Sequence, residues 1–169
     1  MKVLVVYESM FGNTERIAQA IAEGLSTVVD VTITDVARAP AHIPDDVKAL
    51  VVGGPTHAFS MSRLTTRQQA STTHAADAAA VGRGIREWLA ELPVPEDPPV
   101  FVAFDTRVDM PLVPGAASRS ATRFARKHGF RVLQPRSFLV EGYEGPLVEG
   151  EIERARSWGE GLGRVFSGE

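Results

Sequence analysis

Short apolar runs alternate with amphipathic helical patterns along the whole chain. The first run, KVLVVY, is typical of a strand covered on both faces, because its apolar and β-branched residues are consecutive. The predicted strands are Lys2–Tyr7, Val29–Thr34, Ala49–Val52, Val100–Phe104 and an interrupted strand made of 130–133 and 137–140. The predicted helices, with apolar residues at helical spacing, are 13–26, 84–92, 115–128 and 147–166.

This alternation predicts an α/β fold with a parallel sheet and helices on both of its faces. No internal repeat, linker or shift in composition divides the 169 residues, so we expect one domain over residues 1–169. Residues 55–81 are polar and without clear period, which predicts a connection longer than the usual ~4–6 residues. Such a loop is either functional or partly disordered.

Composition narrows the function further. A hydrophobic fraction of 44% is ordinary for a globular protein, and the net charge of −3 argues against nucleic-acid binding. The chain has no cysteine, which excludes disulfides, thiol nucleophiles and cysteine-ligated metals, so redox chemistry would need an organic cofactor. Without a long apolar run or a signal-peptide pattern, we expect a cytoplasmic protein with no membrane span.

The loop after the first strand carries the strongest chemical signal. In an open α/β sheet, ligands bind beyond the carboxyl ends of the strands, where this loop lies. Ser9 and Thr14 offer hydroxyl groups, Asn13 an amide, and Gly12 lets the backbone turn so that helix-start N–H groups meet an anion. Residues 9–15 contain no Lys or Arg, and neither G-x-x-x-x-G-K-[ST] nor G-x-G-x-x-G is present, which disfavours an NTPase. The alternative is an ordinary strand–helix turn with capping residues.

Two segments carry a resemblance to a known family. SMFGNTE, after the first strand, resembles the flavodoxin phosphate loop [ST]-x-[ST]-G-x-T, and GGPTHAF, after the third, resembles the family's G-[ST]-P-T-x loop. The resemblance to the flavodoxin family covers the whole chain in length and element order. It implies a flavodoxin-like, doubly wound, five-stranded parallel sheet of order 2-1-3-4-5, with helices on both faces and FMN as cofactor.

The resemblance also implies roles for three loops. The FMN phosphate would be held by Ser9, Met10, Phe11, Gly12, Asn13 and Thr14. The ribityl chain and one flavin face would be bordered by Pro55, Thr56, His57, Ala58 and Phe59. The other face and the pyrimidine edge would be reached by Asp105, Thr106, Arg107, Val108 and Asp109. Arg107 could place a cation near that edge, and a surface ion pair is the alternative.

Three functions follow as hypotheses. The first is an FMN-binding electron carrier that works between redox partner proteins, a reductase and an acceptor. The second is an NAD(P)H-dependent FMN quinone reductase, suggested by the long polar loop and the weak acidity. The third is a flavodoxin-fold domain that has lost FMN, suggested by the absence of an aromatic residue from 105–111. We expect Tyr143, in EGYEGP (141–146), to be an ordinary packed loop residue, the alternative being that it covers the rim of the site.

Overall fold

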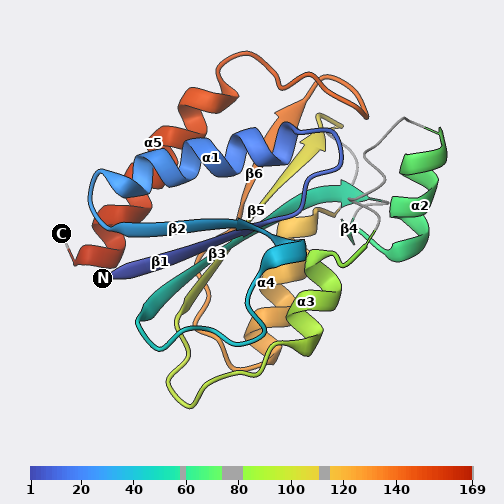
Figure 1. Cartoon of the computed structure of the whole chain (residues 1–169). Coiled ribbons are helices and arrows are strands. Elements are labelled where there is room, and N and C mark those ends of the chain that lie inside the picture. Colours follow the sequence, from blue (N-terminus) through green and yellow to red (C-terminus); the bar gives the residue numbers. More distant parts are fainter. Residues whose placement is uncertain (58–59, 74–81, 111–114, 169) are drawn as a thin grey trace.

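The computed structural model describes residues 1–57, 60–73, 82–110 and 115–168. A twisted parallel sheet runs through its centre (Figure 1), in the order β2-β1-β3-β5-β6. These strands are β1 (Lys2–Tyr7), β2 (Asp30–Asp35), β3 (Val47–His57), β5 (Val100–Val108) and β6 (Arg136–Val140). Numbered along the chain, the five parallel strands have the predicted order 2-1-3-4-5, and the flavodoxin-like fold class is confirmed. The two-residue β4 (Ser60–Met61) adds an antiparallel pairing to the end of β3.

Helices cover both faces of the sheet. α1 (Asn13–Ser26) and α5 (Glu151–Ser167) lie on one face, and α3 (Ile85–Glu91) and α4 (Ala117–Lys127) on the other (Figure 1). Successive residues of β1 alternate between these layers: Val3 and Val5 pack in the α1/α5 core, Leu4 and Val6 in the α3/α4 core. Because both faces are covered, the strand positions after Lys2 are apolar, which explains the continuous run in the sequence.

Glycines allow α1 and α5 to approach closely. A Cβ atom on Gly24 would lie 2.0 Å from the Arg156 carbonyl oxygen, and one on Gly159 would lie 2.2 Å from that of Ile21. Gly159 therefore has a packing role within α5, although glycine lowers helix propensity by about 1 kcal/mol relative to alanine.

The main differences from the prediction concern β3, β5, the last strand and the segment 64–73. The last strand begins at Arg136, and of residues 130–133 only Val132 makes a bridge, to Phe101. β3 does not stop at Val52 but continues to His57, because residues 53–55 pair with β5 and residues 56–57 pair with β4. β5 in turn extends to Val108. The segment expected to be a loop contains a ten-residue helix, α2 (Leu64–Thr73). No helix among the described residues has both the length and the apolar character needed to cross a membrane.

Candidate functional site

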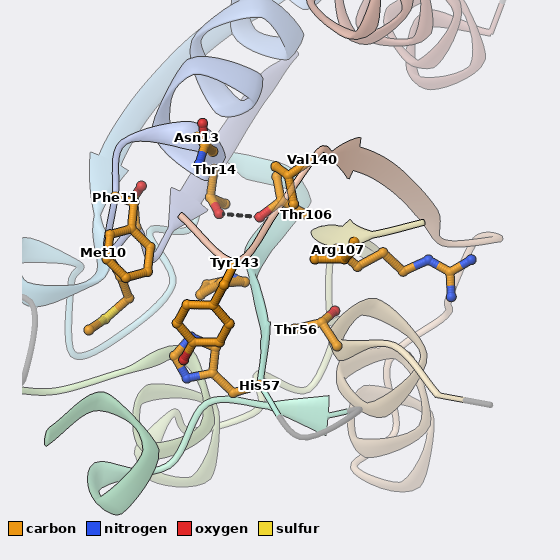
Figure 2. Close-up of a pocket in the computed structure, with 13 residues that line it drawn as sticks. Met10, Phe11, Asn13, Thr14, Thr56, His57, Thr106, Arg107, Val140 and Tyr143 are labelled. Atoms are coloured by element: carbon orange, nitrogen blue, oxygen red, sulfur yellow. Dashed lines mark hydrogen bonds between the residues drawn. The ribbon is translucent and has the colours of Figure 1, made fainter. Parts of the chain in front are cut away.

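A cleft opens where β1, β3 and β5 end, and it encloses about 410 Å³ of empty space that is partly open to solvent (Figure 2). The lining residues are Ser9, Met10, Phe11, Asn13, Thr14, Pro55, Thr56, His57, Thr106, Arg107, Val108, Val140 and Tyr143. The three loops expected from the sequence thus meet at one cleft, together with a fourth segment after β6.

The loop from Ser9 to Thr14 has the geometry of an anion cradle. Gly12 precedes α1 with φ of 88°, a left-handed conformation that favours glycine, and no side chain caps the helix start. The first-turn N–H groups of α1 therefore lack a side-chain cap and carry the positive end of the helix dipole. The Gly12 N–H donates to Ser9 Oγ at 3.1 Å, which holds the loop closed.

A buried hydroxyl pair connects this loop to β5. Thr14 Oγ1 lies 2.7 Å from Thr106 Oγ1, and both side chains are buried (Figure 2). Either hydroxyl can donate, so the pair can turn a proton toward an oxygen of a ligand in the cleft. The site thus offers neutral hydroxyl and N–H donors for an anion, as the sequence predicted.

Aromatic rings form the other side of the cleft. The Tyr143 ring lies 5.7 Å from Phe11 and 6.1 Å from His57, measured between ring centroids (Figure 2). His57 is buried at the end of β3, with Nδ1 3.1 Å from Thr66 Oγ1 of α2. Burial, and secondly the positive charge of Arg67, lower the pKa of His57 to about 4, so its ring is neutral at pH 7.

Not every predicted residue points into the cleft. Arg107 contributes to its wall, but its guanidinium group points away from Thr14 and Tyr143 (Figure 2). Asp105 is fully buried, and its Oδ2 accepts a 2.8 Å hydrogen bond from the Ser118 N–H at the start of α4. Burial raises the pKa of the Asp105 carboxyl, against the lowering effect of the Ser118 hydrogen bonds. Asp109 is exposed and does not line the cleft. Ala58 and Phe59 lie outside the described residues.

Two further residues line the cleft: Val140, which the sequence did not place there, and Tyr143, for which the rim of the site was only the alternative to a packed loop position. A signal for both existed, because the loop after a parallel strand lies at the same sheet edge as the loops after its neighbours. The EGYEGP segment follows the last strand, so it ends at the cleft in the same way.

A buried ionic network lies beside the cleft and was not predicted. Glu8, directly after β1, accepts hydrogen bonds from Ser62 Oγ and from the Ile85 N–H, the latter at 2.9 Å. Arg67 of α2 lies 4.0 Å from Glu8 Oε1, and its Nη2 donates to Glu87 Oε1 at 3.0 Å. Burial raises the pKa of Glu8, against the lowering effects of the Ser62 and Ile85 hydrogen bonds and of the Arg67 charge. The network ties α2 and α3 to the residue that precedes the anion cradle.

The parallel sheet order and a cleft at the strands' carboxyl ends define a doubly wound α/β protein of the flavodoxin-like class. Residues 5–80 match the family model of flavodoxin. A flavodoxin from the domain Archaea is 20% identical, with a TM-score of 0.67 and 99% of both chains covered. Flavodoxin 1 from Bacillus cereus is 15% identical, with a TM-score of 0.65, covering 98% of this chain and 97% of that one. The resemblance to the flavodoxin family is therefore confirmed.

A further similarity is short. An NAD(P)H dehydrogenase (quinone) from Syntrophus aciditrophicus is 44% identical over 45 residues, which are 27% of this chain and 22% of that protein. The matched stretch thus spans about a fifth of the relative's length. Among the described residues, no group of three or more His, Asp or Glu side chains could hold a metal ion.

Proposed function

We propose that this chain binds FMN and works as an electron-transfer protein between redox partner proteins in the cytoplasm. The observation that carries the proposal is the meeting of an uncapped helix start with a cleft lined by aromatic rings, at the carboxyl ends of β1, β3 and β5. We also propose that residues 1–169 act as a single flavodoxin-like domain.

The donor set suits the cofactor. A phosphate needs several hydrogen-bond donors, which Ser9, Thr14 and the first-turn N–H groups of α1 supply without a cationic side chain. A flat aromatic ring needs apolar and aromatic walls, which Phe11, His57 and Tyr143 supply. The residues present therefore fit both ends of FMN.

FMN, when bound, supplies the reversible uptake and release of electrons. The chain's own residues bind the phosphate, orient the ring and exclude water from its walls. The neutral His57 ring adds no charge to the cleft at pH 7, so it would not by itself favour an anionic form of the cofactor.

Titration with FMN tests the proposal. We expect micromolar FMN to show fluorescence quenching and a shifted visible spectrum when the purified protein is added, and riboflavin, which lacks the phosphate, to bind much more weakly. Thr14→Val should weaken FMN binding about 10- to 100-fold, since a hydrogen bond to a charged group contributes about 1.5–3 kcal/mol. Thr27→Val is the matched control, because the Thr27 hydroxyl bonds Gly24 O at the far end of α1. A folded protein that leaves the FMN spectrum unchanged would refute FMN binding.

The same preparation separates the carrier from a quinone reductase. An electron carrier loaded with FMN should not oxidise NADPH with a quinone unless a separate reductase is added. The short similarity to the NAD(P)H dehydrogenase is too limited to favour the enzyme. Steady NADPH oxidation by the protein alone would contradict the carrier role.

A further inference from the structure

The loop after β5 brings no aromatic ring to the cleft. The end of β5 and the loop after it, from Asp105 to Gly115, read DTRVDMPLVPG, which contains no Phe, Tyr or Trp. Phe104, the aromatic residue just before it, is buried in the α1/α5 core. Any aromatic wall on the β5–β6 side of the cleft must therefore come from another segment.

The segment 141–146, which follows β6, is held against the anion cradle. Within it, the Glu141 N–H donates to Pro146 O at 2.9 Å and the Gly145 N–H to Gly142 O at 3.0 Å, so the loop is closed by its own backbone. Asn13 Nδ2, at the start of α1, donates to Glu144 O at 2.9 Å.

Gly145 makes that contact possible. Its φ is 105°, and a Cβ atom there would lie 2.6 Å from Asn13 Nδ2. The loop is therefore fixed at two points, to the end of β6 and to the cradle, and this geometry determines where Tyr143 projects.

Tyr143 projects over the cleft. Its ring makes an edge contact with Phe11, at an interplanar angle of 68°, and stacks at 30° against His57. Both centroid separations fall within the ~4.5–7 Å range of aromatic pairs. The side chain is nevertheless 46% exposed, so part of the ring surface remains open at the mouth of the cleft. An exposed tyrosine with two aromatic neighbours in a ligand cleft has surface available for a further flat ring.

We propose that Tyr143 is the residue that stacks on the flat aromatic ring of the ligand bound in this cleft. It supplies, from the loop after β6, the aromatic contact that the loop after β5 lacks. The inference rests on the proposed FMN function, which it deepens by assigning the ring-binding residue. Stacking would bury the exposed part of the tyrosine and shield one side of the flavin from water.

Two substitutions test the assignment by binding and fluorescence rather than by activity. Tyr143→Leu keeps an apolar side chain but removes the ring, and we expect FMN to bind about tenfold more weakly. Because stacked tyrosine quenches flavin emission, the bound flavin should also be brighter. Tyr143→Phe keeps the ring and should retain the affinity. Glu141→Ala, in the same loop and not among the residues that line the cleft, should behave as wild type.

Lumiflavin, which has the ring without ribityl chain or phosphate, isolates the stacking contribution. Its affinity should fall with Tyr143→Leu by about the same factor as that of FMN. If Tyr143→Leu fails to fold, as judged by circular dichroism, Tyr143→His replaces it in the same titrations. We then expect an affinity for FMN between that of wild type and that expected for the leucine variant.

The outcomes separate the two proposals. If wild type does not bind FMN, the proposed function fails. If wild type binds FMN, but Tyr143→Leu leaves both the affinity and the emission unchanged, the stacking role alone is overturned. Tighter binding by Tyr143→Leu would also overturn it, since the tyrosine would then compete with the ligand for the cleft.

Discussion

Replacing Arg67 by methionine removes a buried cation and leaves two carboxylates without it. Arg67 is 1% exposed, and its guanidinium group serves both Glu8 and Glu87. Methionine fills a similar length of space with an apolar side chain, so the main loss is electrostatic. Glu8 keeps its hydrogen bonds from Ser62 and the Ile85 N–H but is only 3% exposed, so water cannot replace the lost cation.

Arg67→Met should lower the stability of the fold strongly at pH 7. Removing one partner of a buried ion pair lowers the free energy of unfolding by about 3–5 kcal/mol, because the remaining charge is buried without compensation. For a chain of this size, that corresponds to a fall in Tm of roughly 6–20 °C. Arg164→Met is the control, since its pair with Glu160 on α5 is exposed and worth only ~0.3–0.5 kcal/mol.

The loss of stability caused by Arg67→Met should be smaller at low pH, because Glu8 and Glu87 both change it in that direction. The pKa of Glu8 is raised in the folded state, so this group favours folding at low pH and loses that contribution as pH rises through its folded pKa. Without Arg67 this loss becomes greater. Burial acts to raise the pKa of Glu87, but the Arg67 hydrogen bond and charge help to lower it overall, so Glu87 stabilises the wild type above its ordinary pKa and not below. Arg67→Met forfeits that contribution at pH 7 and still at pH 5, and the loss disappears only as the pH falls below the ordinary Glu pKa of 4.5.

Urea denaturation at pH 7 and pH 5 measures the Glu8 effect, because only the raised pKa of Glu8 changes the cost over this interval. Adding Glu8→Gln to Arg67→Met should recover part of the loss at pH 7, because the uncompensated charge is then absent. A cost below about 1 kcal/mol for Arg67→Met, equal at both pH values, would refute this account of the buried pair.

Two further predictions concern the cleft and the sheet beneath it. His57 should titrate near pH 4. Because its folded pKa is depressed, its contribution to stability is present above pH 6.5 and is lost as the pH falls toward 4. An NMR titration, with the His57 signal assigned through His57→Gln, checks this, and a midpoint near 6.5 would contradict it. Gly53→Ala should lower the free energy of unfolding by about 1–3 kcal/mol, since the new Cβ would lie 2.1 Å from the Phe104 ring. Gly161→Ala, where nothing lies within 4 Å, should instead stabilise α5 by up to ~1 kcal/mol, and a similar loss at both glycines in urea melts would refute the packing argument.

The sheet could be predicted because strands covered on both faces appear as continuous apolar runs. Helix α2 could not, because its sequence LTTRQQASTT has no apolar period. Its named contacts are mostly polar: Arg67 enters the ionic network, and Thr66 lies against His57. The apolar packing of α2 is a small cluster of Ala70 with Met10 and Phe11. A helix held by buried ion pairs and hydrogen bonds carries no hydrophobic signal in its sequence.

The loops of the site could be predicted from strand direction, but the side chains that turn into it depend on where each strand ends. If β5 ended at Phe104, Asp105 and Arg107 would be free to face the cofactor. Because β5 continues to Val108, its side chains keep alternating between the two helical layers.

Along β5, Phe101 and Ala103 pack in the α3/α4 core, whereas Val102 and Phe104 pack in the α1/α5 core. The same alternation sends the Asp105 carboxylate to α4 and turns the Thr106 hydroxyl to Thr14 of α1. Arg107, two residues beyond Asp105, follows the α4 side, which explains why its guanidinium group points away from Thr14. Extending the period-two pattern by four residues keeps Thr106 in the site and directs the Asp105 carboxylate and the Arg107 guanidinium group toward the α4 side.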